Sequence, residues 1–163
     1  MSEHGTAATT GVAAITDYLD GQRVAYELVE HESTMTAAAE AQAAHRPKHQ
    51  VAKTVVLHGG GGYVLAVLPA SERLDLGKLR DILGGPVLRL ASEKEMAADL
   101  PMVEVGATPP VGPMLPRLEV LDARLYEEDR ILCAAGDHRH SVLLDPREVV
   151  RLADARVADV CED

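Results

Sequence analysis

The chain has 163 residues, of which 47% are hydrophobic, and this is enough for one domain with a substantial core. With no Phe, no Trp and four Tyr, a site that stacks several nucleic-acid bases on aromatic rings is not expected. The net charge of −10 argues against a broad basic surface for DNA or RNA and leaves room only for a local basic patch.

The termini and cysteines point to a cytoplasmic protein. Cys133 and Cys161 are too few for a disulfide framework. The opening MSEHGTAATTG lacks the charged and apolar regions of a signal peptide. No apolar run approaches the ~20 residues that span a membrane. We therefore expect a soluble protein that binds neither membranes nor DNA.

The first half of the chain predicts helices separated by strands. Val12, Ile15 and Leu19 have helical spacing. The alanine-rich second helix has Thr34 or Thr36 as its capping residue. In chain order we expect a helix over 8–21, a strand over 24–31, a helix over 34–44, a polar break over 46–50, and strands over 51–57 and 63–69 joined by a turn at the glycines 59–62.

The second half continues the mixture. Ser92 and Glu95 form a capping box, and Pro146 is typical of a first helical turn. We expect helices over 75–83, 92–100 and 146–154, strands over 86–90, 118–125, 131–136 and 140–145, and an irregular segment over 103–117. No repeat or linker divides the chain. The pattern predicts an α+β fold in a single domain over residues 1–163.

Lys53 stands in the apolar run VAKTVVL, residues 51–57. Strand alternation would place it on the same face as Val51, Val55 and Leu57. Burying an ammonium group is unfavourable unless a partner compensates it. Lys53 therefore either extends to solvent or points into a site that uses its charge.

Two glycine-containing segments are candidate parts of a site. GATPPVGP, residues 106–113, combines glycine with stiff prolines and would let main-chain groups approach a ligand, or it is a surface loop. AAGDHRHS, residues 134–141, reads as a hairpin turn with His138 and His140 on one strand face. These histidines would need a third ligand, such as His31, His45 or His49, to bind zinc.

The order of these features resembles the YbaK/ProX family of aminoacyl-tRNA deacylases, which includes the editing domain of some bacterial prolyl-tRNA synthetases. The resemblance covers about residues 22–160 and rests on the lysine strand, on YVLAVLPASERLDLGKLRDILGG, on the Gly106–Pro110 loop and on GDHRH. It implies a YbaK-like fold in which helices surround a mixed, barrel-like sheet. It also implies hydrolysis of a mischarged aminoacyl-tRNA ester without metal or other cofactor.

The resemblance also implies site residues and partners. Lys53 would be the essential residue, holding the terminal adenosine or the ester, and Thr54 its neighbour in the pocket. Substrate would be contacted by Gly106, Ala107, Thr108, Pro109 and Pro110 and by the turn Ala134, Ala135 and Gly136. The partners would be the acceptor end of an aminoacyl-tRNA and, as a second candidate, an aminoacyl-tRNA synthetase.

Three positions depart from the branch that hydrolyses cysteinyl-tRNA. Val29 stands in place of an aromatic residue, Ala134 in place of serine and Ser141 in place of an acidic residue. The substrate amino acid therefore stays open, and a non-catalytic binding module of the same fold is the alternative. A metal-dependent hydrolase using His138 and His140 is a third interpretation.

Two groups of basic residues would touch tRNA phosphates. The first group is Arg46, Lys48, His49 and Lys53, and the second is Arg73, Lys78 and Arg80.

Overall fold

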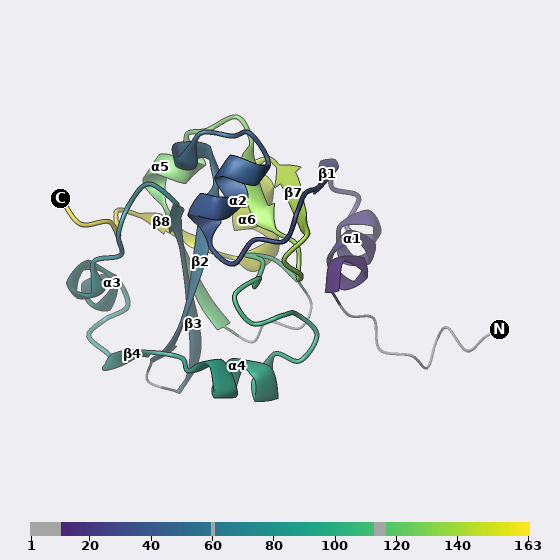
Figure 1. The fold of residues 1–163 in the computed structure, drawn as a ribbon. Coiled ribbons are helices and arrows are strands. Elements are labelled where there is room, and N and C mark those ends of the chain that lie inside the picture. The colour runs from purple at the N-terminus through teal and green to yellow at the C-terminus, as the bar shows by residue number, and fades with distance from the viewer. Residues whose placement is uncertain (1–10, 60, 113–116) are drawn as a thin grey trace.

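Two β-sheets and their covering helices make up the fold in the computed structural model, which describes residues 11–59, 61–112 and 117–163 (Figure 1). The helices are α1 (Gly11–Gly21), α2 (Ala37–Ala43), α3 (Leu76–Ile82), α4 (Glu93–Asp99), α5 (Ala123–Tyr126) and α6 (Pro146–Ala153), with a 3-10 turn, η2 (Lys48–Gln50). The strands are β1 (Tyr26–Glu30), β2 (Ala52–Gly59), β3 (Gly62–Pro69), β4 (Leu88–Leu90), β5 (Arg117–Asp122), β6 (Ile131–Ala134), β7 (His140–Leu144) and β8 (Arg156–Ala158).

The strands pair in a three-stranded and a five-stranded sheet. The smaller sheet is antiparallel with the order β1-β7-β6. The larger has the order β4-β2-β3-β5-β8 and is mixed, because β2 is antiparallel to β3 and β4 whereas β5 is parallel to β3 and β8. A single bridge between Val51 and Leu132 connects them. The described strands therefore do not close into the barrel-like sheet that we expected.

Apolar side chains fill the space between the two sheets. The main cluster joins Ile15 and Leu19 of α1 to Val67, Leu121 and residues of β6 and β7, and α5 and α6 pack on the same cluster. Other clusters lie under α3, under α4 and between α2 and the start of β2. This packing holds β2, β6, β7 and α2 in fixed positions, and these elements carry the candidate site.

Most predicted elements form, and their capping residues act as expected. Thr36, rather than Thr34, caps α2 by accepting a hydrogen bond from the Ala39 N–H. The capping box of Ser92 and Glu95 is present in α4, and Pro146 opens α6. Residues 8–10 of the first predicted helix, Gly60 of the predicted turn and residues 113–116 of the irregular segment lie outside the described residues.

The predicted strand over 118–125 is wrong at its end. The strand stops at Asp122, whose side chain accepts the Arg124 N–H and caps the short helix α5. The five residues LDARL alternate apolar and charged side chains as a strand does, but so short a segment fits a helix equally well, so its alternation is misleading. The three-residue strand β8 was not predicted, because so short a segment has no detectable period and forms only by pairing with β5.

Candidate functional site

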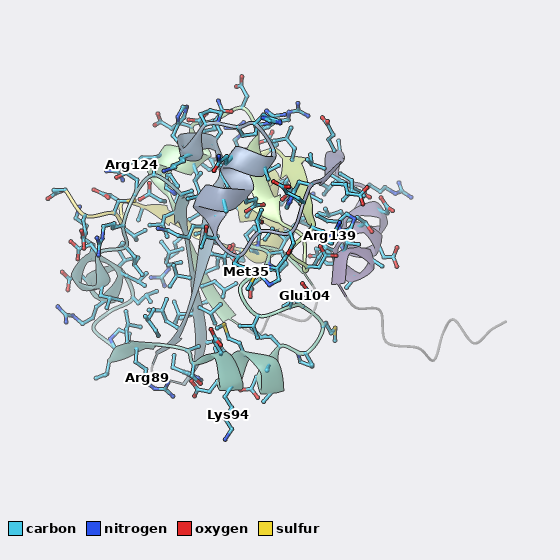
Figure 2. The ribbon with its side chains drawn as sticks, in the orientation of Figure 1. Met35, Arg89, Lys94, Glu104, Arg124 and Arg139 are labelled. Carbon is cyan, nitrogen blue, oxygen red and sulfur yellow. The ribbon has the colours of Figure 1, made fainter. Side chains whose placement is uncertain are left out.

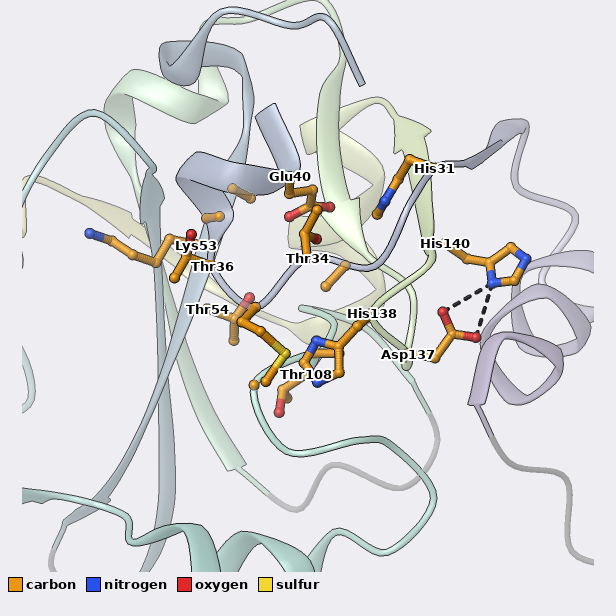
Figure 3. Close-up of a pocket in the computed structure, with 16 residues that line it drawn as sticks. His31, Thr34, Thr36, Glu40, Lys53, Thr54, Thr108, Asp137, His138 and His140 are labelled. Carbon is orange, nitrogen blue, oxygen red and sulfur yellow. Dashed lines mark hydrogen bonds and ion pairs between the residues drawn. The ribbon is translucent and has the colours of Figure 1, made fainter. Parts of the chain in front are cut away.

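A cavity of about 250 Å³ lies where β2, α2, the loop around Gly106 and the turn before β7 meet (Figure 3). This is below the ~300–1,000 Å³ that is usual for sites of drug-sized ligands. Its size suits a small group such as an aminoacyl moiety. The lining residues are His31, Thr34, Met35, Thr36, Ala37, Glu40, Ala52, Lys53, Thr54, Gly106, Ala107, Thr108, Ala134, Asp137, His138 and His140.

Backbone hydrogen bonds hold the two glycine segments together at the cavity wall. The Gly136 N–H donates to the Ala107 carbonyl over 3.1 Å, and the Glu104 N–H donates to the Gly136 carbonyl over 2.8 Å. The His138 ring lies against Gly106, where an added Cβ would come within 3.3 Å of it. Gly106 has a φ of +88°, which favours glycine. The loop and the turn thus form one wall, although about 30 residues separate them.

The structure brings together six of the ten residues that we expected at the substrate. Lys53, Thr54, Gly106, Ala107, Thr108 and Ala134 line the cavity. Pro109, Pro110, Ala135 and Gly136 are buried and do not line it. Gly136 nevertheless contributes to the wall through the hydrogen bond that its N–H donates to the Ala107 carbonyl.

The ammonium group of Lys53 does not point at the other lining residues. It extends to the far side of β2 from Thr54 and His138 (Figure 3) and donates to the Glu72 carbonyl over 2.7 Å. Alternation along β2 explains this, because adjacent side chains leave a strand on opposite faces. Burial lowers the pKa of Lys53, and the nearby Arg73 acts in the same direction. Lys53 therefore lines the cavity, while its ammonium group lies beyond β2 from Thr54 and His138.

A buried carboxyl group, Glu40, lies on the wall that α2 contributes. Its Oε2 is hydrogen bonded to the hydroxyl of Ser141, which is fully buried on β7. Burial raises the pKa of Glu40 to about 7, and the Ser141 hydrogen bond opposes this shift. His31, after β1, places Nε2 2.8 Å from the same hydroxyl.

Sequence reasoning did not select Glu40, and it considered His31 only as a metal ligand. The partners of the two residues lie 101 and 110 positions away in the chain, so no local pattern could have revealed the contact. The one local feature that could have drawn attention to Glu40 was a charged residue within an alanine-rich helix. Ser141 was noted only as a departure from the related family, and the carboxyl group of Glu40 lies against it.

The histidines of the turn have separate partners. His138 Nε2 lies 2.9 Å from the Val105 carbonyl, and His140 Nδ1 lies 2.9 Å from Asp137 Oδ2. Among the described residues, the one group of potential ligands close enough to share an ion is Asp122, Asp159 and Cys161, away from the cavity. Lys78 and Arg124 already bind Asp159 there. The arrangement gives no support to a metal centre on His138 and His140.

Comparison with known proteins identifies the class of domain. The family model of the aminoacyl-tRNA editing domain matches residues 31–152. A protein of Enterococcus faecalis, named "Putative Cys-tRNA(Pro)/Cys-tRNA(Cys) deacylase EbsC", is 26% identical over 136 residues, which are 83% of this chain and 82% of that protein.

Solved structures agree with this match. A "putative trans-editing enzyme for prolyl tRNA synthetase" has a TM-score of 0.83 and 30% identity, with 96% of this chain and all of that chain covered. A scaffold protein used for epitope backbone grafting by computational design has a TM-score of 0.83 and 28% identity, with 93% of this chain and 97% of that chain covered. Within the described residues, no helix is long and apolar enough to cross a membrane.

Proposed function

The chain belongs to the aminoacyl-tRNA editing domain family, and we propose that it is a trans-editing deacylase acting in the cytoplasm. It would hydrolyse the ester between an incorrect amino acid and the 3′ end of a tRNA. The observation that carries this proposal is the small cavity, whose lining residues all lie within the matched range 31–152. We further propose that residues 1–163 form one domain, with its functional core at about 22–160.

The walls of the cavity suit an aminoacyl ester. Thr34, Thr54 and Thr108 offer hydroxyl groups for the polar atoms of an amino acid, and Ala107 and Ala134 leave space for its side chain. The loop that holds Gly106 brings main-chain groups close to the ligand and would fix the ester relative to the attacking water. A difference of one methylene changes binding by only ~1–3 kcal/mol, so the substrate amino acid is left to experiment.

We propose that Lys53 acts by positioning the tRNA end at the rim. Its ammonium has three N–H donors, of which the Glu72 carbonyl takes one. A phosphate oxygen makes a stronger, charge-assisted hydrogen bond than a neutral carbonyl does. Lys53 would therefore bind the phosphate or ribose of the terminal nucleotide and place the ester in the cavity.

Two alternatives make different predictions. A non-catalytic module would bind aminoacyl-tRNA or a nucleotide without turnover. A metal-dependent hydrolase would lose activity in EDTA, whereas the proposed deacylase would not.

Because one similar structure is described as a trans-editing enzyme for prolyl tRNA synthetase, a synthetase is a candidate partner of this chain as well.

The test is a deacylation panel. The protein would be assayed against tRNAs charged with alanine, serine, cysteine or proline, with and without EDTA. We expect hydrolysis of one or two esters, unaffected by EDTA. Lys53→Ala should lower kcat/KM about 10- to 100-fold, because a hydrogen bond to a charged group contributes ~1.5–3 kcal/mol.

The control is Lys94→Ala on α4, which removes the same charge from an exposed helix away from the cavity (Figure 2). It should leave kcat/KM unchanged. A folded wild type that hydrolyses none of the esters would contradict the proposal and favour the binding module. Full activity of Lys53→Ala would contradict the positioning role of Lys53 but not the deacylase function.

A further inference from the structure

Glu40 and His31 both meet Ser141, which lies 101 and 110 positions away in the chain, and the three side chains form one hydrogen-bonded series beside the cavity. Glu40 Oε2 is bonded to Ser141 Oγ, and Ser141 Oγ lies 2.8 Å from His31 Nε2. The other ring nitrogen, Nδ1, lies 2.8 Å from the Glu32 carbonyl. Glu40 is 5% exposed and Ser141 is fully buried, so this chain leads from the protein interior to the more accessible His31.

The geometry of these hydrogen bonds determines how many hydrogens Glu40, Ser141 and His31 share. A carbonyl only accepts, so His31 Nδ1 carries a hydrogen toward Glu32. The Ser141 hydroxyl has one hydrogen, yet it takes part in two hydrogen bonds. A second hydrogen must therefore come from Glu40 or from His31 Nε2. Either both residues are neutral, or Glu40 is a carboxylate and His31 is an imidazolium.

The second carboxyl oxygen of Glu40 is available to the cavity. Glu40 lines the cavity, and in the described part of the chain no donor is hydrogen bonded to its Oε1. In Figure 3 the carboxyl group of Glu40 and the ring of His31 extend from opposite sides toward the same region, next to Thr34. Both ends of the hydrogen-bonded series thus line the cavity, with Glu40 buried and His31 more accessible.

We propose that Glu40, Ser141 and His31 form a proton relay for ester hydrolysis, an inference that rests on the proposed deacylase function. Glu40 is the catalytic residue, because it would meet the attacking water. Ser141 and His31 act through it as positioning and proton-accepting residues.

The relay operates as a balanced cycle. The water oxygen bonds to the ester carbonyl carbon and gives its proton to Glu40 Oε1. Glu40 Oε2 passes its own proton to Ser141 Oγ, and the Ser141 hydroxyl proton goes to His31 Nε2. When the tetrahedral intermediate breaks its bond to the ribose oxygen, the same transfers run in reverse and protonate that oxygen. The products are the free amino acid, which ionises in solvent, and tRNA with its terminal hydroxyl.

The surroundings of Glu40 favour its neutral, protonated form before the reaction begins. Burial raises its pKa to about 7, close to the pH at which a relay group must exchange protons. The charged and titratable groups around it are Cys133 on β6, whose thiol pKa burial also raises, Lys53 on β2, and Asp137, His138 and His140 at the cavity. Above this pKa Glu40 loses the Oε2 proton that the relay passes to Ser141, and the relay stops.

The experiment compares pH–rate profiles of the wild type, Glu40→Gln and Ser141→Ala on the ester that the panel identifies. For the wild type we expect kcat to be highest below pH 7 and to fall with a midpoint at about pH 7, because Glu40 then loses the proton that its Oε2 passes to Ser141. Glu40→Gln keeps the shape of the side chain but cannot relay a proton. It should lower kcat by about 100-fold or more, leave KM within about twofold and abolish the fall near pH 7.

A second variant and a control separate the relay from a structural role. Ser141→Ala interrupts the same path, so the double variant should be no slower than the slower single variant. Glu127→Gln removes an exposed carboxylate away from the cavity and should keep the wild-type profile. An active wild type with an unchanged profile in Glu40→Gln, or additive losses in the double variant, would overturn the relay alone. A wild type that hydrolyses no ester would overturn the deacylase function and the relay together.

Discussion

Gly136 shows how single residues shape the wall of the cavity. Its φ is +97°, and a Cβ at this position would lie 2.8 Å from the Gly11 carbonyl oxygen at the start of α1. Backbone atoms cannot move aside as a flexible side chain can. Gly136 therefore lets α1 lie directly against the turn, and the same residue donates to the Ala107 carbonyl in the neighbouring loop.

We predict that Gly136→Ala lowers the free energy of unfolding by about 3 kcal/mol, from backbone strain together with the clash against Gly11. Gly84→Ala is the matched control, because Gly84 has a φ of +87° but no atom within 4 Å of an added Cβ. It should lose only about 1 kcal/mol. Urea unfolding of both variants measures the difference, and equal losses would show that the contact with Gly11 adds nothing.

Lys53 and Thr54 show what residue-scale reasoning from the sequence achieves. The apolar run around Lys53 leaves two outcomes open, a side chain that extends to solvent or one that points into a site, and in the structure the half-buried lysine donates to the Glu72 carbonyl. The pattern cannot identify that partner, because the Glu72 carbonyl comes from the segment after β3. Alternation alone predicts that Lys53 and Thr54 leave β2 on opposite faces, as Figure 3 shows.

At the scale of elements, Asp122 joins three segments at the end of β5. Its fully buried carboxylate accepts hydrogen bonds from the backbone N–H groups of Arg124 and Val160, each over 2.9 Å. Arg124 also forms an ion pair with it over 3.2 Å. The Cys161 thiol donates to Asp122, and burial, followed by this hydrogen bond, raises the thiol pKa to about 12. The C-terminal segment is thus fastened to β5 and α5 by one side chain.

Asp122→Asn should lower the free energy of unfolding by about 3 kcal/mol, because it leaves buried donors and Arg124 without their carboxylate partner. Asp81→Asn on α3, where the side chain is 81% exposed, is the control and should change it by less than about 0.5 kcal/mol. Denaturant midpoints with unchanged slopes would establish these values. A loss for Asp122→Asn as small as that of the control would contradict the fastening role.

On the scale of the whole molecule, the distribution of charge determines where the proposed deacylase would bind tRNA phosphates. The net charge is −10, so any phosphate contacts must be local. Of the two basic groups in the sequence, Lys78 is engaged by Asp159, Asp163 and the Cys161 carbonyl. Arg46 and Lys48 have no side-chain partner among the described residues and lie between α2 and β2, both of which line the cavity.

We predict that kcat/KM of the deacylation falls with salt, with a log–log slope that Arg46 and Lys48 determine. Each phosphate contact to a single strand contributes about −0.7 to this slope. The double variant Arg46→Glu/Lys48→Glu should therefore make the slope shallower by about 1.4. Lys94→Glu/Arg130→Glu applies the same charge change at two exposed residues outside both basic groups and should alter the slope less. Equal slopes in the two double variants would exclude specific phosphate contacts by Arg46 and Lys48.

Sequence by itself determined the α+β composition, most helices and strands, their caps and the two glycine segments of the cavity. Those features depend on residues within a few positions of one another, as with Ser92 and Glu95. Tertiary structure alone decided that the sheets stay separate, that Lys53 donates to the Glu72 carbonyl, and that Glu40 and His31 both meet Ser141. The two contacts of Ser141 join residues about a hundred positions apart, and hydrophobic periodicity reports which face is buried but not which partner the fold brings to it.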